Sequence, residues 1–293
     1  MNPLPSEEYV YKCTTACAGC TSSLSLRYVL KAAGPDTVLV VPACCTSVLQ
    51  GVYPATAMNV TVYNIAFAAA AATASGMAAA FRRQGRPTNV ICYAGDGGTV
   101  DIGIQSLSGA FERGTDFLYI CYDNEAYGNT GMQRSGATPI GAVTTTTPAG
   151  KTDTKKDIDR IVAAHGLPYM ATACAAYPQD LYAKVKKALS IPGPKFIHLL
   201  SPCPPGWRYP TERSVEVGRL AVKTGLWVLY ERVHGELTIN PVSKVAMKRP
   251  APIEDYLRIQ GRFRGISDEA KSALRAAMEQ QHRRLLAEEA GSC

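Results

Sequence analysis

The stretch NVICYAGDGGT, residues 89–99, combines the features that decide the fold. Its first half is a short apolar run with β-branched and aromatic residues, which is typical of a buried strand. Its second half is a glycine-rich turn, and a helix-length segment follows near residues 102–113. A buried strand, a tight turn and a helix in this order predict one unit of an α/β sheet.

Three further apolar runs share this character, at residues 37–41, 117–122 and 195–200. Helix-length segments lie around them, near residues 22–33, 61–84, 155–165 and 179–189. Because continuous apolar strands alternate with helices, we expect an α/β fold: an open, mainly parallel sheet with helices on both faces. Residues 1–210 would form this domain. The more polar residues 211–293, with a helix near 267–289, would form a C-terminal extension that packs on the core or on a partner.

Each of the four apolar runs is followed by a turn that carries a chemically reactive side chain. These side chains are, in chain order, Cys44 and Cys45, Asp96, Asn124 and Cys203. Ligands of open parallel sheets bind at the carboxyl ends of the strands. We therefore expect these side chains to lie along one edge of the sheet.

The composition narrows the classes of protein that fit. Ten cysteines in 293 residues, with no apolar leader behind a positive start, favour metal or redox chemistry over a disulfide framework. The longest apolar stretch, residues 66–81, is mostly alanine, so we expect no membrane span and a cytoplasmic location. The net charge of +7 is moderate and no aromatic–basic module is present, which argues against nucleic-acid binding. The basic C-terminal region is typical of a solvated helix face, although it could also dock an acidic electron carrier.

Asp96 and Asn124 are spaced as ligands of one hard cation. They lie 124 − 96 = 28 residues apart, which leaves room for one helix and one strand between two neighbouring strand ends. Oxygen ligands completed by phosphate oxygens are the usual surroundings of Mg²⁺. Gly95, Gly97 and Gly98 would let the backbone approach such a ligand closely. A tight turn capped by aspartate explains the Gly-Asp-Gly triplet alone equally well, so the spacing to Asn124 carries the magnesium prediction.

This spacing resembles the thiamine diphosphate motif, in which an aspartate, an asparagine or threonine and a backbone carbonyl hold Mg²⁺. In this sequence the carbonyl position matches Ala126. In the polar loop that follows, Asn129 and Thr130 could donate hydrogen bonds to the phosphate or to the thiazolium side. Capping of the loop is the alternative role for both.

Cys17 and Cys20 form a C-x-x-C pair. Such a pair occurs in thioredoxin-like redox sites, zinc sites and iron–sulfur sites, and the absence of a preceding strand weakens the first reading. Cys45 and Cys203, at the predicted sheet edge, would bring the thiolates to four. Four thiolates fit zinc as well as iron–sulfur. An iron–sulfur cluster is favoured because thiamine chemistry that ends in oxidation needs a nearby electron acceptor.

Several other cysteines compete with this set or have structural roles. Cys44 competes with Cys45, and Cys13 competes with Cys17 and Cys20. The remaining ones are predicted to be structural and are Cys92, Cys121, Cys174 and Cys293.

Long motifs resemble the β subunits of pyruvate:ferredoxin oxidoreductase (pyruvate synthase), within the 2-oxoacid:ferredoxin oxidoreductase family. They are ACAGC at 16–20, AGDGGTVDIG at 94–103, CYDNEAYGNTGMQRSGATP at 121–139, TTTTPAGK at 144–151 and SPCPPGW at 201–207. The resemblance resumes at KTGLWVLYE, residues 223–231, and at EDYLRIQGRF, residues 254–263, and so covers nearly the whole chain.

The resemblance implies a ligand set for each cofactor. A 4Fe-4S cluster would be held by Cys17, Cys20, Cys45 and Cys203. Cys45 is selected over Cys44 because the hydroxyl pair Thr46-Ser47 follows it, and Thr46 would lie beside the cofactor. Mg²⁺ of thiamine diphosphate would be bound by Asp96, Asn124 and the carbonyl of Ala126. Asn129 would lie near the reacting carbon as the catalytic side chain.

The resemblance also implies the reaction and its partners. Pyruvate would be oxidatively and reversibly decarboxylated to acetyl-CoA and CO₂, with coenzyme A taking the acyl group and ferredoxin or a ferredoxin-like subunit taking the electrons. Activation of thiamine needs a carboxylate beside the pyrimidine ring. Glu125 neighbours the predicted metal ligand and Glu112 ends a helix, so neither fits that role. A partner subunit would supply this glutamate.

Three positions depart from the pattern and leave the 2-oxoacid open. Gly128 stands where a bulkier residue is usual, Met58 replaces an aromatic and Ala68 replaces a carboxylate. Sister enzymes for 2-oxoisovalerate, oxalate or an aryl glyoxylate are therefore alternatives. A non-oxidative thiamine decarboxylase would have no use for four placed cysteines, and a zinc-stapled binding module would need neither Asp96 nor Asn124.

Overall fold

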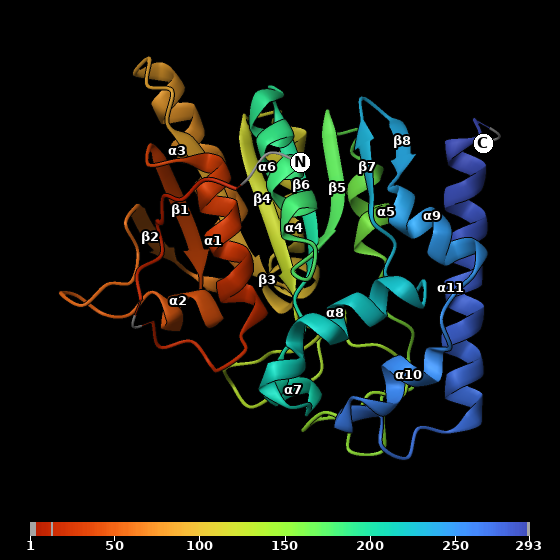
Figure 1. The fold of residues 1–293 in the computed structure, drawn as a ribbon. Coiled ribbons are helices and arrows are strands. Elements are labelled where there is room, and N and C mark those ends of the chain that lie inside the picture. Colours follow the sequence, from red (N-terminus) through yellow and green to blue (C-terminus); the bar gives the residue numbers. More distant parts are fainter. Residues whose placement is uncertain (1–3, 13, 292–293) are drawn as a thin grey trace.

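The computed structural model describes residues 4–12 and 14–291. Cys13, predicted as a competing cluster ligand, and Cys293, predicted to be structural, lie outside the described residues. The described chain is organised around one eight-stranded sheet with the order β2-β1-β3-β4-β6-β5-β7-β8 (Figure 1). The strands are β1 (Thr37–Pro42), β2 (Thr61–Ile65), β3 (Asn89–Gly95), β4 (Phe117–Asp123), β5 (Tyr169–Cys174), β6 (Pro194–Leu200), β7 (Tyr230–Val233) and β8 (Glu236–Ile239).

The four predicted strands are confirmed as β1, β3, β4 and β6, and they are neighbours in the sheet. From β2 to β5 all pairings are parallel, so these strands end at the same edge. The residues of β1, β4 and β6 are buried throughout. Burial on both faces explains why these strands read as continuous apolar runs.

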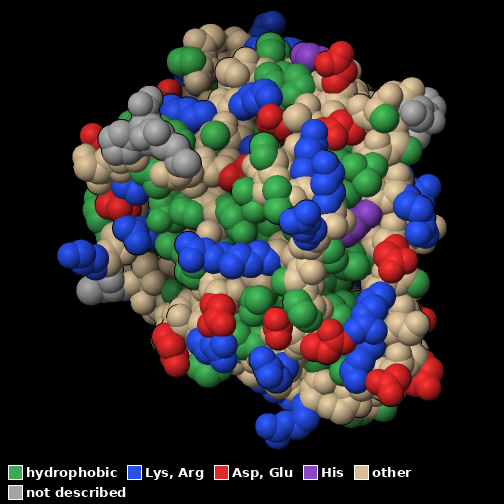
Figure 2. Space-filling model, turned by 45° about the vertical axis from the view of Figure 1, so that its right-hand side comes forward, with side chains coloured by type: hydrophobic (Ala, Val, Ile, Leu, Met, Phe, Trp, Pro, Cys, Tyr) green, Lys and Arg blue, Asp and Glu red, His purple; other side chains and the backbone are tan. Residues whose placement is uncertain are grey.

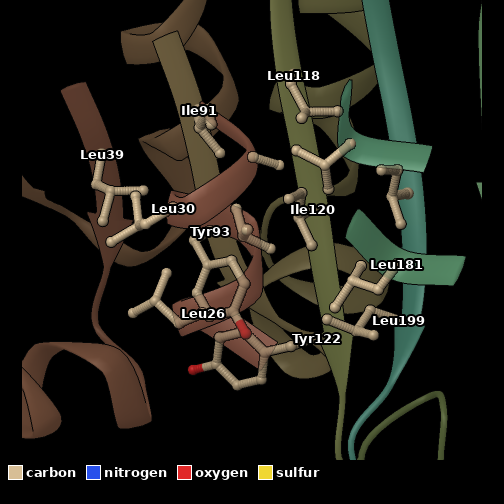
Figure 3. Packing of buried hydrophobic residues seen from close by; sticks show 14 of the residues in the cluster. Leu26, Leu30, Leu39, Ile91, Tyr93, Leu118, Ile120, Tyr122, Leu181 and Leu199 are labelled. Atoms are coloured by element: carbon tan, nitrogen blue, oxygen red, sulfur yellow. The ribbon is translucent and has the colours of Figure 1, made fainter. Parts of the chain in front are cut away.

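Helices cover both faces of the sheet, as predicted. On one face α1 and α6 pack over β1, β3, β4 and β6 through a core that includes Leu30, Tyr93 and Leu181 (Figure 3). On the other face α3, α4 and α5 contribute Ala74, Leu107 and Val162 to a second core. The helices of this part are α1 (Thr21–Ala33), α2 (Cys45–Leu49), α3 (Ala70–Arg83), α4 (Ile104–Glu112), α5 (Ile158–Ala163), α6 (Pro178–Ser190) and α7 (Pro204–Trp207), with the short turns η1 (Phe67–Ala69) and η2 (Gly97–Asp101).

The helix predicted over residues 61–84 is wrong in its first part. Residues Thr61–Ile65 form β2, an edge strand that pairs with β1, and α3 begins only at Ala70. The sequence TVYNI is rich in residues that favour strands. Pairing with the edge of β1 therefore outweighs the helical character of the alanine-rich segment behind it.

The C-terminal region adds to the same sheet. Strands β7 and β8 form an antiparallel hairpin that pairs with β5. The predicted helix near residues 267–289 is confirmed as α11 (Asp268–Glu289), which packs beside β8. The other elements are η3 (Thr211–Arg213), α8 (Ser214–Lys223), α9 (Pro241–Lys248), α10 (Ile253–Arg258) and η4 (Gly261–Phe263). Helices α7 and α10 lie at the same end of the sheet as α2 (Figure 1). The boundary near residue 210 stays a prediction.

The surface of this region mixes both signs of charge. On the face shown in Figure 2, lysine and arginine side chains alternate with acidic ones. Arg284 pairs with Asp157 at 2.8 Å and Arg258 with Asp255 at 3.5 Å. This pattern favours a solvated, ion-paired face over a basic docking patch. Within the described ranges, no helix is both long and apolar enough to cross a membrane.

Candidate active site

A cavity of about 480 Å³ opens at the carboxyl ends of β1, β3 and β4. Three of the four predicted turns line it, with Cys45 after β1, Asp96 after β3 and Asn124 after β4. Cys203 follows β6 in the adjacent turn, as the order of the strands requires. The residues that line the cavity are Ala43, Cys44, Cys45, Ser47, Val48, Phe67, Gly95, Asp96, Gly97, Gly98, Ile102, Tyr122, Asn124, Ala126, Tyr127, Gly128, Asn129 and Thr130.

Asp96 is buried and only half of its carboxylate is satisfied. Its Oδ2 accepts a hydrogen bond from Ser135 Oγ at 2.5 Å, whereas its Oδ1 has no partner among the described residues. Burial raises the pKa of Asp96 well above its usual range, and the negative charge of Asp123 adds to this. A buried carboxylate oxygen without a donor is costly unless a cation or a ligand completes it.

The glycines around Asp96 leave space that a side chain would fill. A Cβ on Gly97 would lie 2.4 Å from the Tyr127 ring, so only glycine fits there without movement. Gly98 faces Phe67 across ordinary contact distance, and Gly95 lies against Tyr122. Backbone and cavity therefore meet directly along residues 95–98, as the sequence predicted for a ligand approached by main chain.

Asn124 and Ala126 belong to a tight turn at the end of β4. The Asn124 Oδ1 accepts a hydrogen bond from the backbone N–H of Ala126 at 3.2 Å. The indole N–H of Trp207 donates to the Asn124 carbonyl at 2.7 Å. Between them Glu125 has a φ of 61°, the left-handed conformation that favours glycine. The turn is held from both sides, and both Asn124 and Ala126 face the cavity.

A buried group of charges lies behind this turn. Asp123 accepts from Lys155 Nζ at 2.7 Å and pairs with His198 Nε2 at 3.0 Å, and His198 Nδ1 pairs with Asp159 at 2.9 Å. Burial alone would raise the pKa of Asp123, but Lys155 and His198 outweigh it and hold this pKa below its usual range. Burial would lower the pKa of His198, but Asp159 and Asp123 raise it to about 9. The turn therefore rests on charges that compensate one another.

Asn129 and Thr130 lie in the exposed loop at the mouth of the cavity. The Cys45 thiol donates to Asn129 Oδ1 at 3.0 Å, which joins the loop to the turn after β1. The Thr130 hydroxyl bonds to Gln133, whose Nε2 donates to the Thr130 carbonyl at 2.6 Å. Thr130 thus caps its own loop, one of the two roles considered for it. Asn129 is positioned beside both the cavity and a predicted cluster ligand.

The four predicted cluster cysteines gather at the same end of the sheet. Cys20 is the N-cap of α1, where its sulfur accepts from the Ser23 N–H at 3.4 Å, and its own N–H donates to the Cys17 carbonyl at 3.1 Å. Burial raises the pKa of Cys45, and the charge of Cys203 adds to it. Burial also raises the pKa of Cys203, to about 12, with contributions from Cys20 and Cys17. In the part of the chain that is described, no three cysteine, histidine or acidic side chains converge closely enough to hold a metal ion.

The other cysteines and Thr46 have simpler surroundings. Cys44 lines the cavity beside Cys45. Thr46 is fully buried, and its hydroxyl has no hydrogen-bond partner among the described residues. The cysteines at 92, 121 and 174 are buried in the cores, as their apolar surroundings in the sequence predicted.

Sequence reasoning did not assign several side chains that build the site. Tyr127 and Phe67 shape the cavity, Ser135 holds Asp96, and Trp207 holds Asn124. Ser135 and Trp207 lie within the quoted motifs, and that was the only signal for them. Arg262, whose side chain pairs with Glu125 at 2.6 Å, also lies within a quoted motif, residues 254–263, but was assigned no role.

A family model matches the segment that contains the cavity. Residues 43–199 match the thiamine pyrophosphate enzyme C-terminal TPP-binding domain. This segment begins just after β1 and ends within β6, so it spans the turns that carry Cys45, Asp96 and Asn124.

Curated relatives match over nearly the whole chain. The ketoisovalerate oxidoreductase subunit VorB of Pyrococcus horikoshii is 48% identical over 96% of this chain and 94% of its own. The pyruvate synthase subunit PorB of Methanocaldococcus jannaschii is 50% identical over 90% of this chain and 92% of its own. Among solved structures, a 2-oxoglutarate:ferredoxin oxidoreductase from Magnetococcus marinus has the same fold, with a TM-score of 0.60, 19% identity and coverage of 94% of this chain and 98% of that chain.

Proposed function

Because the chain belongs to the β subunits of the thiamine diphosphate-dependent 2-oxoacid:ferredoxin oxidoreductases, we propose that it binds the cofactor's diphosphate through Mg²⁺ and passes electrons to a 4Fe-4S cluster. The reaction is the reversible oxidative decarboxylation of pyruvate, with coenzyme A as acyl acceptor and ferredoxin or a ferredoxin-like subunit as electron acceptor. The cytoplasmic location stays a prediction. The observation that carries the proposal is the unpartnered, buried oxygen of Asp96 at the cavity.

The donor set around Asp96 fits a magnesium–diphosphate group. Asp96 offers a free carboxylate oxygen, and the Asn124 side chain and the Ala126 backbone line the same cavity. Mg²⁺ prefers such oxygen ligands and shares its shell with phosphate oxygens. A dication would also counteract the raised pKa of Asp96, because it stabilises the ionised carboxylate. The residues present therefore fit the group.

The cysteine set fits an iron–sulfur cluster by its chemistry. Four thiols, from the segment before α1 and from the turns after β1 and β6, lie within electrostatic reach of one another. Thiols with raised pKa values are poor metal ligands as long as they are protonated, and metal binding releases their protons. We expect the four sulfurs to reach bonding distance as the cluster is bound, since metal binding and local folding are coupled.

Thiamine diphosphate supplies the electron sink that allows CO₂ to leave a 2-oxoacid. The chain's own residues bind and orient around it. Asp96, Asn124 and Ala126 would hold the metal, and Asn129, at the mouth of the cavity, would orient the carbonyl group of the substrate. The apolar walls formed by Phe67 and Tyr127 would keep water from the reacting atoms.

The cavity lacks the carboxylate that thiamine activation requires. Among the described residues that line it, Asp96 is the only acid, and it is assigned to the metal. Two apolar side chains that line the cavity are exposed to solvent, Val48 to 54% and Ile102 to 45%. Exposed apolar side chains beside a site are typical of a surface that a partner covers. Both features support a partner subunit that supplies the glutamate and closes the cavity.

A branched 2-oxoacid such as 2-oxoisovalerate is the second candidate substrate. Gly128 lines the cavity, and a side chain there would lie 3.3 Å from the Cys45 sulfur. Glycine therefore leaves room where the family pattern has a bulkier residue. The ketoisovalerate relative also matches a larger share of this chain than the pyruvate relative does.

A substrate panel on the assembled enzyme tests the proposal. The complex is supplied with coenzyme A, an artificial electron acceptor, and pyruvate, 2-oxoisovalerate, oxalate or an aryl glyoxylate in turn. The proposal predicts the highest kcat/KM for pyruvate. A higher value for 2-oxoisovalerate would favour the second candidate, and turnover without any electron acceptor would contradict both.

A further inference from the structure

The turn that carries the proposed metal ligands contains a strained residue. Glu125 is a buried, non-glycine residue with a φ of 61°. Side chains rarely adopt this conformation, and it persists only where surrounding contacts enforce it. One such contact comes from the Thr138 hydroxyl, which donates to the Glu125 carbonyl at 2.6 Å. The Glu125 backbone N–H also donates to Asp123 Oδ1 at 2.8 Å. Further contacts act on the Glu125 side chain.

Two cations hold the Glu125 carboxylate. Lys155 Nζ lies 2.9 Å from Oε1, and Arg262 Nη2 lies 2.6 Å from Oε2. Lys155 is shared, because it also pairs with Asp123 at 2.7 Å. Arg262 is nearly completely buried, and Glu125 is its only acidic partner among the described residues. Arg262 therefore provides the charge that is dedicated to Glu125.

Arg262 reaches the turn by a second route. Its guanidinium lies 3.8 Å from the centre of the Trp207 ring, and the Trp207 indole N–H donates to the Asn124 carbonyl at 2.7 Å. Its Nε donates to the Gln260 side chain at 2.9 Å, which fixes the plane of the guanidinium. A planar cation is suited to stack on an aromatic ring while it pairs with a carboxylate. One side chain thus holds Glu125 directly and Asn124 through Trp207.

We infer that Arg262 is a positioning residue of the cofactor site. From the C-terminal region, it keeps the turn of residues 124–126 in the shape that presents the Asn124 side chain and the Ala126 carbonyl to the cavity. The inference rests on the proposed Mg²⁺ site, whose ligands it supports. Trp207 belongs to α7, which begins directly after Cys203. The contact between Arg262 and Trp207 therefore also links the turn of residues 124–126 to the turn that carries Cys203, a predicted cluster ligand.

The test compares Arg262→Met with Arg264→Met in the assembled enzyme. Arg264 is two residues away and exposed, so it controls for the loss of one positive charge. Calorimetry measures Mg²⁺ binding in the presence of thiamine diphosphate, and amide hydrogen exchange follows residues 123–127 in the Mg²⁺-free protein. Arg262→Met should weaken Mg²⁺ binding about 10-fold or more and speed exchange in this segment, because supporting contacts orient metal ligands. Arg264→Met should change neither.

Two further variants keep the test decisive if Arg262→Met does not fold. Arg262→Lys retains the charge for Glu125 but not the planar stacking, and should recover part of the affinity. Trp207→Phe retains the ring but not the donor to Asn124, and should speed exchange in the same segment. Wild-type Mg²⁺ affinity together with wild-type exchange in both variants would overturn the inference.

Failure of the proposed function gives a different result. If the wild-type complex does not bind Mg²⁺ with thiamine diphosphate, the metal site is wrong. The exchange measurement in the Mg²⁺-free protein still decides whether Arg262 holds the turn.

Discussion

The two halves of the candidate site differ in how completely their side chains are already assembled in the folded chain. The metal half, which comprises Asp96, Asn124 and Ala126, is buried and supported by fixed contacts. The cysteine half, which comprises Cys17, Cys20, Cys45 and Cys203, is more exposed, and its described thiols do not converge. We infer that the sheet edge preforms the metal half, whereas the cluster itself completes the cysteine half. Asp96 and Asn124 directly follow buried strands of the sheet, whereas Cys17 and Cys20 come from the segment before α1.

The largest effect is expected in the cysteine half. If the cluster is what brings the thiols together, Cys45→Ala should abolish the reduced iron–sulfur EPR signal. Cys44→Ala is the matched control, because Cys44 also lines the cavity and should leave the signal in place. A signal that survives in the Cys45 variant and disappears in the Cys44 variant would exchange the two assignments.

In the metal half, Asp96→Asn should lower the affinity for Mg²⁺ with thiamine diphosphate about 100-fold, because a direct ligand matters at least as much as a supporting one. The same change should not destabilise the Mg²⁺-free protein. Asp96 Oδ1 is buried without a hydrogen-bond partner, which makes an ionised carboxylate unfavourable there. The neutral amide of asparagine avoids this unfavourable charge. Calorimetric titration and thermal unfolding measure the two quantities. Undiminished affinity would show that the carboxylate does not bind the metal.

The charges behind the metal half should make its stability depend on pH. The pKa of His198 is raised from 6.5 to about 9, so its stabilising contribution is complete below pH 6.5 and is lost as the pH rises through 9. At about 1.36 kcal/mol per pKa unit, the loss is at most about 3 kcal/mol. Urea unfolding of the full chain across this range should show the decline, and His198→Gln should flatten it. An equal decline in the variant would assign it to other groups.

The smallest effect concerns the choice of substrate. Gly128 has an ordinary backbone conformation, so alanine can replace it without backbone strain. The added methyl group should shift the ratio of kcat/KM values for pyruvate and 2-oxoisovalerate towards pyruvate by about 10-fold, since one methyl group in a pocket contributes about this much. Kinetics on the assembled complex measure the ratio. An unchanged ratio would mean that residue 128 does not contact the substrate.

The sequence predicts the buried part of the fold and of the site better than the rest. The strands β1, β3, β4 and β6 are continuous apolar runs because helices cover both of their faces. The edge strand β2 escaped prediction because it is partly exposed and precedes an alanine-rich helix. Strands β5, β7 and β8 were not predicted either. In β5, the run YMATAC mixes small and polar residues and lacks a clear strand pattern.

The same limit applies to the side chains of the site. Asp96 and Asn124 were predictable because each directly follows a recognisable strand. Their supports come from far along the chain: Ser135 reaches Asp96 across 39 residues, and Trp207 reaches Asn124 across 83. Arg262 lies 262 − 125 = 137 residues from Glu125. Contacts of this kind depend on tertiary packing, which no local pattern encodes.

Assay of the purified chain alone, compared with the assembled complex, tests the central claim most directly. Both are supplied with Mg²⁺, thiamine diphosphate, coenzyme A, pyruvate and an electron acceptor, and reduction of the acceptor is followed. Because Asp96 is the only acid that lines the cavity in the described chain, the isolated chain should show no turnover, and the complex should be active. Full activity from the isolated chain would contradict an active site that is completed by a partner.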